Sequence, residues 1–401
     1  MAARTHGVGA RSLLGRGMWI WHLERSEGGN LAAIVARAHA AGLTTVLVKS
    51  SDGARYWSQF SPQLVRTLHA GRLHVCAWQY VYGSDPIGEA AMGIRAVHTG
   101  ADCLVIDAEA TYEGRYAAAQ SYLRHLRAAV GRHFAVGLAS YPYVDYHPSF
   151  PYSVFLGRGG AQFDLPQMYW KDIGTSIDQV FAHTFTSNRI YGRPILPLGQ
   201  TYGSPSATEI GRFRALTLGY HARGISWWDW AWTSASRAWA WVGAGLASVL
   251  GSARGTPTLP LLGQGARGDQ VLWVQEHLAR MYRAEHLTGV FGSQTLGYLR
   301  AFQARRRLPV TGRTDYATWR ALLRLSPVTV SWAAPRPSVR GRASRLTGHP
   351  ARRPQRTGPD PRRVRGSAGG TRAGPASASL PALGYEIPPP GAEPPDLGPA
   401  S

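Results

Sequence analysis

Apolar and polar positions follow two alternating patterns over the first 250 residues. Short runs of β-branched, aromatic and other apolar residues are typical of strands buried on both faces, and they alternate with Ala-rich segments of helical period. The predicted strands are 17–21, 44–50, 74–82, 103–110, 134–141, 163–170, 195–202 and 224–230. The predicted helices are 31–41, 62–70, 86–99, 114–130, 176–185 and 208–219. Several of these helices end at a glycine, a common C-terminal stop signal.

Eight strands that alternate with helices over about 240 residues predict an α/β fold of the (β/α)8 TIM-barrel type. An open doubly wound sheet is the alternative, although no Gly-rich dinucleotide-binding fingerprint follows the first strand. Residues 142–160 contain Pro, Tyr and Gly without a clear helical period. From the start of the first predicted strand and the end of the alternating pattern, we expect a flexible leader at 1–16 and a barrel at 17–250.

A different pattern follows a linker predicted at 251–260. Val271, Val274 and Leu278 recur at helical spacing, and so do Thr295, Leu299 and Phe302. Glycines mark the turns between these segments, so 261–326 is predicted to be a small three-helix domain. Residues 327–401 are rich in Pro, Arg, Gly, Ser and Ala. Such a segment cannot bury enough apolar surface to offset chain entropy, so we predict a disordered tail.

The composition is strongly basic, with a formal net charge of +21. Lys49 and Lys171 are the only lysines, and the remaining basic residues are arginines, a usage typical of GC-rich bacterial coding. A basic chain favours polyanions such as nucleic acid or an anionic cell wall. The aromatic residues follow no nucleic-acid-binding motif, so we expect the wall as the partner and no nucleic acid.

Cysteine usage and hydropathy bound the remaining possibilities. Cys76 and Cys103 both lie in apolar strand-like stretches, which favours buried free thiols, with a disulfide as the alternative. No metal-ligand cysteine spacing occurs, and no metal or cofactor is expected. No segment approaches the ~18 apolar residues of a membrane span. Residues 1–16 lack an apolar run of signal-peptide length, so export would need another route. We expect a monomer.

The stretch Leu104-Val105-Ile106-Asp107-Ala108-Glu109 carries the clearest chemical signal. Successive strand side chains alternate, so Asp107 and Glu109 project to the same side. An acidic pair at the end of a buried strand is costly unless it is solvated, partnered or used. In a (β/α)8 barrel that end carries the active site. The alternative is that one carboxylate caps the next helix or pairs with an arginine.

The ends of the other predicted strands carry aromatic, amide and charged side chains. Aromatic faces stack on sugar rings and amides hydrogen-bond to sugar hydroxyls, so we expect a glycan site, with ordinary barrel packing as the alternative. The candidate substrate-binding residues are Trp21, Lys49, Gln79, Tyr141, Gln167, Tyr169, Gln200, Tyr202 and Trp228, and Asp229 is a reserve second carboxylate.

Residues 262–325 resemble the bacterial peptidoglycan-binding module of the three-helix type. The match includes the Gly265-x-x-Gly268-x-x-Val271-x-x-Val274-Gln275 pattern, the Phe291-Gly292-x-x-Thr295 turn, the Ala301-Phe302-Gln303 helix and the closing Thr318-Trp319. Thr288-Gly289 stands where Asp-Gly is common, and Gly297 stands where Ala is common. The resemblance implies that this domain binds cell-wall glycopeptide.

The barrel resembles glycoside hydrolases that act on N-acetylated sugars, namely family 25 lysozymes and family 18 chitinase-like enzymes. Asp107-x-Glu109 is shared with both families, and Gln167-Met168-Tyr169 and Trp227-Trp228 look like family 18. Val105 replaces the middle Asp of the longer family 18 motif, and the first strand ends in Trp21 where family 25 usually has an Asp. A barrel that binds glycan without cutting it is therefore the alternative.

The resemblance implies specific roles for these residues. Glu109 would be the general acid that protonates the glycosidic oxygen, and Asp107 would orient the substrate's acetamido group, whose oxygen Tyr169 could hydrogen-bond. We therefore expect a cell-wall or extracellular protein that hydrolyses N-acetylated glycan strands, with a non-catalytic wall-binding protein as the alternative.

Overall fold

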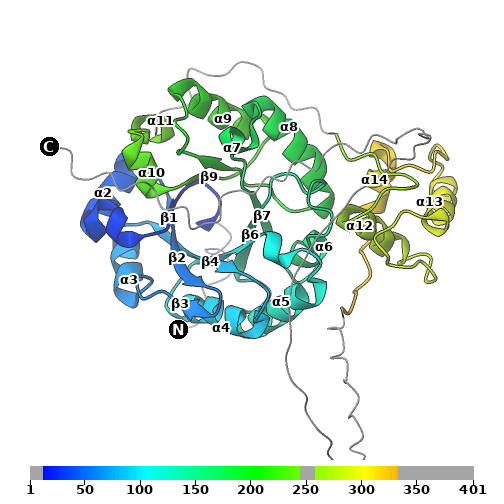
Figure 1. Ribbon diagram of the computed structural model, residues 1–401, viewed down its shortest axis with the longest axis horizontal. Helices are drawn as coiled ribbons and strands as arrows, with labels where there is room; N and C mark the ends of the chain where they lie inside the picture. Colours follow the sequence, from blue (N-terminus) through cyan, green and yellow to red (C-terminus); the bar gives the residue numbers. More distant parts are fainter. Residues whose placement is uncertain (1–11, 244–257, 333–401) are drawn as a thin grey trace, which may run out of the picture. The chain divides into compact units, whose positions relative to one another are not determined.

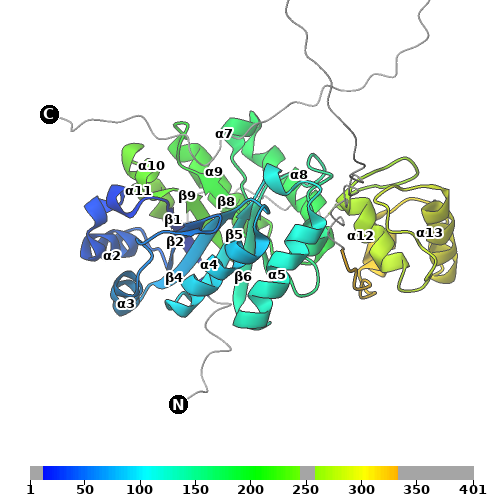
Figure 2. The ribbon, with the colours of Figure 1, turned by 60° about the horizontal axis from the view of Figure 1, so that its bottom comes forward.

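The computed structural model describes residues 12–243 and 258–332, and its largest part is a parallel barrel surrounded by helices (Figures 1 and 2). The barrel strands lie in the order β7-β6-β5-β4-β2-β1-β9-β8. Two isolated parallel bridges, Asp164 with Ile195 and Gln167 with Leu198, join the two ends of this order and nearly close the barrel. The predicted barrel is therefore confirmed, and the open doubly wound alternative is excluded. The strands are β1 Arg16–Ile20, β2 Thr45–Asp52, β4 His74–Val81, β5 Cys103–Ala108, β6 Ala135–Ser140, β7 Phe163–Pro166, β8 Leu198–Gln200 and β9 Ile225–Trp228.

The helices lie outside the strands, as the alternating pattern predicts (Figure 1). Most begin at a Ser, Asn or Asp whose side chain accepts a backbone N–H, which satisfies donors that the first helical turn leaves free. The barrel helices are α2 Leu31–Ala40, α3 Pro62–Ala70, α4 Pro86–His98, α5 Tyr116–Val130, α6 Tyr152–Phe155, α7 Trp170–Ile173, α8 Ile177–Asn188, α9 Ala207–Gly219, α10 Trp230–Ala235 and α11 Trp239–Gly243. The short helix α6 lies in the stretch without helical period, and the two-residue strand β3, Arg55–Tyr56, pairs with β2.

Alternation along each strand sorts side chains between the barrel interior and the layer under the helices. On β4, Cys76 and Trp78 belong to the interior cluster, whereas Val75 and Ala77 belong to the layer that contacts the helices. The same rule on β5 directs Val105 inward. Near the carboxyl end of each strand, every second side chain therefore points toward the barrel axis.

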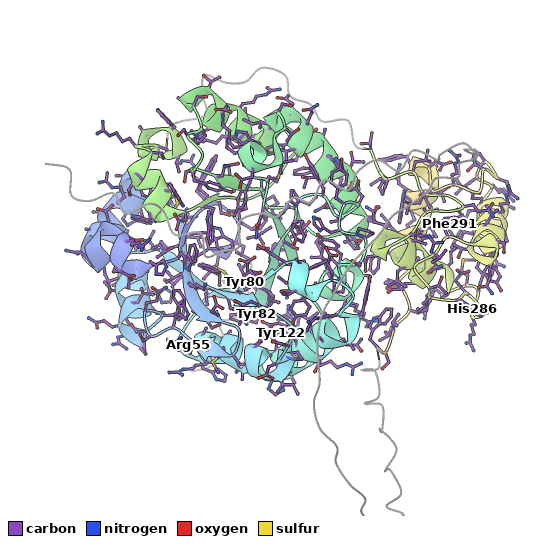
Figure 3. The ribbon with its side chains drawn as sticks, viewed as in Figure 1. Arg55, Tyr80, Tyr82, Tyr122, His286 and Phe291 are labelled. Atoms are coloured by element: carbon purple, nitrogen blue, oxygen red, sulfur yellow. A yellow bond between two sulfur atoms is a disulfide. The ribbon has the colours of Figure 1, made fainter. Side chains whose placement is uncertain are left out.

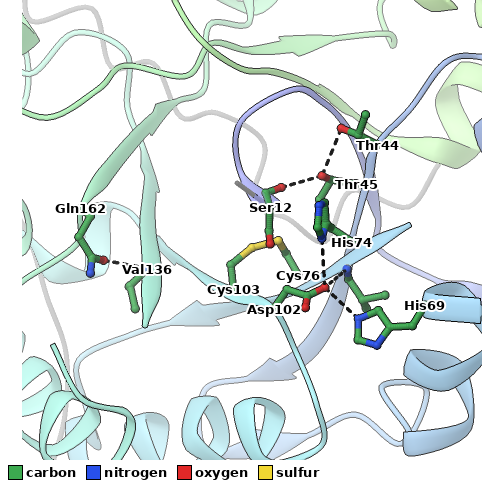
Figure 4. The surroundings of a disulfide bond; sticks show 11 residues. Ser12, Thr44, Thr45, His69, His74, Cys76, Asp102, Cys103, Val136 and Gln162 are labelled. Carbon is green, nitrogen blue, oxygen red and sulfur yellow. Dashed lines mark hydrogen bonds and ion pairs between the residues drawn. A yellow bond between two sulfur atoms is a disulfide. The ribbon is translucent and has the colours of Figure 1, made fainter. Parts of the chain in front are cut away.

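The two cysteines form a disulfide, Cys76–Cys103, which corrects the expectation of free thiols (Figure 4). Adjacent strands β4 and β5 pair these residues directly in their parallel register, with 4.6 Å between the Cα atoms. Both side chains point into the barrel interior, and this separation lies within the range that a disulfide requires. Strand register brings the thiols together, and register cannot be read from cysteine spacing.

Residues 12–15, predicted to belong to a flexible leader, pack at the amino-terminal end of the barrel. Leu13 joins the interior cluster and Ser12 is fully buried. The Thr45 hydroxyl donates to the Ser12 carbonyl at 2.6 Å, and the Gly15 N–H donates to the Arg223 carbonyl at 3.1 Å. These contacts start the fold before β1, while residues 1–11 lie outside the described part.

The C-terminal unit contains three helices, α12 Asp269–Leu278, α13 Ser293–Arg305 and α14 Tyr316–Leu322, as predicted. Two buried glutamines of the helical motifs hold its turns. The Gln275 side-chain oxygen accepts the N–H of Gly289 at 2.9 Å, and its amide donates to the Val290 carbonyl at 3.0 Å. Gln303 binds the turn 311–313 in the same way. Each amide supplies both the donor and the acceptor that a buried turn lacks.

Asp269 at the start of α12 links this unit to barrel residues, and both parts belong to one compact unit. Its two carboxylate oxygens accept hydrogen bonds from the Ser153 N–H and hydroxyl and from the hydroxyls of Tyr116 and Tyr191, at 2.7–3.0 Å. Four donors satisfy a fully buried carboxyl group, although burial still raises the pKa of Asp269 to about 6.

Residues 327–332, predicted to begin the disordered tail, contact helices on both parts. The Val328 N–H donates to the Glu276 carbonyl at 3.0 Å. On α5, the Gln120 side chain donates to the Val330 carbonyl at 2.8 Å and accepts the Trp332 N–H at 2.9 Å. The Trp332 ring lies 4.6 Å from that of Tyr116. The rest of the predicted tail, from 333, and residues 244–257, which include most of the predicted linker, lie outside the described residues.

These contacts generate a stability prediction. Truncation after Ser326 should lower the free energy of unfolding by about 1–3 kcal/mol relative to truncation after Trp332, because it removes a partly buried indole and four hydrogen bonds. Calorimetry of the two truncated proteins measures the difference. Equal melting temperatures would show that residues 327–332 contribute nothing to the fold.

Candidate active site at the carboxyl end of the barrel

Gln167 joins the two candidate carboxylates. Its side-chain nitrogen donates to Asp107 Oδ1 and to Glu109 Oε1, each at 2.9 Å. Asp107 is the penultimate residue of β5 and is 2% exposed, while Glu109 directly follows the strand and is 6% exposed. Gln167 is itself fixed, because its backbone N–H donates to the Ser140 carbonyl on β6 at 2.9 Å. Three neighbouring strands therefore build one buried carboxylate pair.

Burial is the main cause of the raised pKa values of this pair. It raises the pKa of both Asp107 and Glu109 above the usual carboxyl range, and the charge of Glu109 raises that of Asp107 further. The Gln167 amide opposes both shifts because it donates to the ionised forms. Two ionised carboxyl groups that share one buried donor repel each other, so the state in which one of them is protonated is favoured. The protonated member of the pair can supply a proton to a substrate.

Three buried tyrosines surround the pair: Tyr80, Tyr141 and Tyr169. Burial and the nearby carboxylates raise the pKa of each phenol, so all three remain hydrogen-bond donors. Tyr141 and Tyr169 are among the sequence-predicted site residues, and Tyr80 is not. Tyr80 is labelled in Figure 3. It follows the inward-facing Trp78 by two residues on β4, so the alternation of that strand was the signal for it.

Lys49 places a positive charge beside the pair. Its ammonium donates to Asp52 Oδ2 at 2.7 Å and lies 4.4–5.1 Å from the ring centroids of Trp21, Trp57 and Trp78. The side chain is 1% exposed, and burial lowers its pKa while Asp52 opposes that shift. The charge of Lys49 also acts on Asp107 and lowers that carboxyl's pKa. The cation is thus held by one carboxylate and three aromatic faces.

Tryptophans fill the barrel interior below and beside these groups. The rings of Trp19, Trp78 and Trp228 lie 5.3–5.6 Å from one another, and Trp21 lies 5.9 Å from Trp228. Trp21 and Trp228 are partly exposed, whereas Trp19 and Trp78 are fully buried. The buried Trp21 indole N–H has no hydrogen-bond partner among the described residues. It is a free donor beside the lysine.

Three of the predicted site residues have other partners. Gln79 faces outward and donates to the Glu89 carbonyl on α4 at 3.1 Å. Gln200 accepts the Lys171 N–H at 2.8 Å, and the Tyr202 hydroxyl donates to Asp172. Gln200 and Tyr202 therefore organise the loops after β7 and β8. No hydrogen bond joins any of the three to the carboxylate pair in the described structure.

Asp229, the reserve carboxylate, is a helix cap. It accepts the Trp232 N–H at 3.1 Å and begins α10. The peptide bond before it, Trp228–Asp229, is cis. Burial raises the pKa of Asp229 to about 6, and several backbone N–H groups oppose that shift. Its position fits a structural role at the end of β9.

A cavity of about 370 Å³ lies beside the lysine and its aromatic neighbours. Its lining includes His22, Tyr56, Trp57 and Gln59. The Gln59 amide donates to the Trp21 carbonyl at 2.7 Å and to the Lys49 carbonyl at 2.9 Å, which ties the cavity wall to the ends of β1 and β2. The cavity therefore adjoins the residues that surround the ammonium.

Among residues 12–243 and 258–332, no group of three or more His, Cys, Asp or Glu side chains is arranged to hold a metal ion. No helix among the described residues is long and apolar enough to cross a membrane.

Solved structures similar to the chain include three with low sequence identity. An endo-1,4-β-D-mannanase from Thermotoga petrophila has a TM-score of 0.41 at 7% identity, over 54% of this chain and 88% of that one. A fungal endo-β-N-acetylglucosaminidase of glycosyl hydrolase family 18 has a TM-score of 0.40 at 13% identity, over 57% and 98%. The catalytic domain of endolysin ply40 from a Listeria monocytogenes phage has a TM-score of 0.27 at 18% identity, over 38% and 73%. No curated protein matches the chain.

A family model described as "Putative peptidoglycan binding domain" matches residues 267–322. This match covers α12, α13 and α14 and confirms the predicted resemblance of the three-helix unit. It also supports peptidoglycan as the partner and a cell-wall context for the protein. The chain therefore combines a peptidoglycan-binding domain with a (β/α)8 barrel that carries a buried carboxylate pair.

Proposed function

We propose that the barrel hydrolyses the N-acetylated glycan strands of peptidoglycan, with Glu109 as the general acid. The observation that carries this proposal is the buried Asp107–Glu109 pair bridged by Gln167. A peptidoglycan-binding domain on the same chain supports the choice of polymer. The protein would act as a monomer, without a cofactor or nucleic acid. The Cys76–Cys103 disulfide suits a cell-wall or extracellular location.

The two carboxyl groups would divide the work of hydrolysis. Protonated Glu109 would donate its proton to the glycosidic oxygen as the C–O bond breaks, so that the leaving sugar departs as a neutral alcohol. Ionised Asp107 would orient the substrate acetamido group, whose oxygen would stabilise the sugar carbon. Tyr169 would donate a hydrogen bond to that acetamido. Water would then complete the reaction and return a proton to Glu109.

Lys49 would oppose protonation of Asp107, whereas burial and the charge of Glu109 act more strongly in the other direction. The Lys49 ammonium lowers the pKa of Asp107, whereas no described cation acts in the same way on Glu109. The positive charge therefore favours the state in which Asp107 is ionised and Glu109 is protonated. This is the state that the proposed mechanism requires, so Lys49 would be a positioning residue for the proton.

Aromatic and donor groups around the pair would hold the sugar. Trp21 and Trp228 are partly exposed rings at adjacent strand ends, and stacking against a sugar would bury their apolar faces. The free Trp21 N–H is a donor for a sugar hydroxyl or acetamido oxygen. The adjoining cavity of about 370 Å³ offers space for a neighbouring sugar of the strand.

A barrel that binds glycan without cutting it is the second candidate function. Gln167 occupies one oxygen of each carboxylate, and the two side chains are only 2% and 6% exposed. Hydrolysis would require the substrate to reach the other oxygen of Glu109, Oε2, in this buried position, whereas binding through the outer aromatic rings would not.

Replacement of the acid tests the catalytic proposal. Glu109→Gln should lower the rate of peptidoglycan solubilisation on the order of 10²–10⁴-fold, because the glutamine cannot protonate the leaving oxygen. Binding to insoluble peptidoglycan should persist. The matched control is Glu27→Gln, which removes a surface carboxylate paired with Arg37. An unchanged rate in Glu109→Gln would remove Glu109 from the mechanism.

Replacement of Lys49, with Lys171 as the comparison, provides a second test. Lys49→Gln should raise the pKa of Asp107, so the pH below which activity is lost should move upward. Carbon-13 NMR titration of the carboxyl groups and the pH profile of the rate would measure both effects. Lys171→Gln is the control, because Lys171 pairs with Glu209 and not with the carboxylate pair. A profile that is identical in wild type and Lys49→Gln would contradict the proton assignment.

Sugar stacking predicts a binding defect. In a Glu109→Gln background, Trp228→Ala should weaken the binding of chitin oligomers to the full chain by roughly 1–3 kcal/mol, the scale of exposing one large side chain. Tryptophan fluorescence titration would follow the binding. Trp239→Ala on the outer helix α11 should bind as the parent does. If no N-acetylated oligomer or muropeptide binds at millimolar concentration, both glycan functions of the barrel fail.

A further inference from the structure

The peptidoglycan-binding domain contains a cavity of about 390 Å³ that the motif match does not assign to a ligand. Its walls come from the segment before α12, from α13 and from the turn before α14. The side chains that matter to its chemistry are Leu261, Gln264, Leu296, Arg300, Thr311 and Arg313.

Internal contacts hold the walls of this cavity in place. Buried Gln303 accepts the Gly312 N–H at 2.9 Å and donates to the Arg313 carbonyl at 2.9 Å, which fixes the turn. Gly312 has a φ of +70°, and a Cβ there would lie 2.6 Å from Leu296 Cδ1 and 3.1 Å from Arg300 Nε. The glycine therefore allows the turn to approach the arginine on α13 closely.

The two arginines of the cavity have no anionic partner. Among the described residues, neither the Arg300 nor the Arg313 guanidinium makes an ion pair or a hydrogen bond, and no Asp or Glu lines the cavity. In contrast, Arg212 pairs with Asp178 elsewhere on the surface. Two unpartnered guanidinium groups that share one cavity create a site suited to an anion.

The other side chains that line the cavity indicate which anionic group of the cell wall would fit. Leu261, which is 60% exposed, and Leu296 offer apolar contact for small methyl side chains. Gln264 and Thr311 offer an amide and a hydroxyl for peptide groups. No aromatic ring lines the cavity, so it lacks the flat surface on which a sugar would stack. This composition matches a short peptide with a free carboxylate better than a sugar.

We propose that this cavity binds the peptide stem of peptidoglycan through a free carboxylate held by Arg300 and Arg313. The inference rests on peptidoglycan as the polymer that the protein engages, and it is independent of any hydrolysis in the barrel. It assigns the peptide to the C-terminal domain and leaves the glycan strand to the barrel.

The first experiment compares two ligands that differ in their free carboxylates. N-acetylmuramyl-L-alanyl-D-glutamate carries two, and its diamide, in which both carboxyl groups of the D-glutamate are carboxamides, carries none. Calorimetric titration of the full chain, with Glu109→Gln to prevent hydrolysis, should show about tenfold or greater preference for the carboxylate, because charge-assisted hydrogen bonds are lost with the amide. Equal affinity for both ligands would overturn the proposal.

The second experiment uses variants in the same background. Arg300→Gln and Arg313→Gln should each weaken the binding of the acidic ligand about tenfold and reduce the preference over the amide. Arg305→Gln, an exposed arginine on α13 outside the cavity, is the matched control and should leave both affinities within about twofold. Loss of affinity in all three variants alike would indicate a general charge effect and would overturn the specific site.

Competition distinguishes a peptide site from a general anion site. Inorganic phosphate at a concentration equal to that of the acidic ligand should displace little of it if the cavity reads peptide groups as well as charge. Equal displacement by phosphate would overturn the peptide assignment. All readouts are binding measurements on a hydrolysis-blocked protein. A barrel without hydrolytic activity therefore leaves them unchanged, and their failure leaves the Glu109 test unaffected.

Discussion

One side-chain amide organises the candidate active site: the Gln167 nitrogen donates to both Asp107 and Glu109 at 2.9 Å. Two carboxyl groups in a nearly dry barrel interior would otherwise face each other without a donor, which is a costly arrangement. The amide spans from β7 to β5, so it requires the strand order and register of the barrel. The tyrosines, Lys49 and its tryptophan neighbours lie around this pair, and in the proposed mechanism they would influence its protonation and the approach of a substrate.

Periodicity predicted the barrel well because each element has a clear pattern and a capped or glycine-marked end. The predicted helix at 62–70 matches α3, and the strand at 103–110 contains β5. The side-chain phase was harder to predict where both faces of a strand are buried. On β4, Gln79 faces α4 and Tyr80 faces the carboxylates, although both are polar and adjacent. Polar character alone does not say which face is inside.

Contacts between distant segments explain the other differences from the sequence-based expectation. The Cys76–Cys103 disulfide depends on the register between two strands, and cysteine spacing carries no information on register. Residues 327–332 lack the composition of a packed segment, yet Trp332 finds the ring of Tyr116 and the side chain of Gln120. The folded surface supplies these contact partners, so local composition underestimates how well such segments pack.

The central claim is that the barrel cuts glycan, and product chemistry tests it most directly. Purified wild-type protein is incubated with peptidoglycan, and new reducing ends and new free amino groups are both counted over time. The account predicts that reducing ends accumulate while amino groups stay constant, because a glycosidic bond is broken and no peptide bond is. Peptidoglycan that stays bound to the protein but gains no reducing ends would contradict the account and leave a glycan-binding barrel.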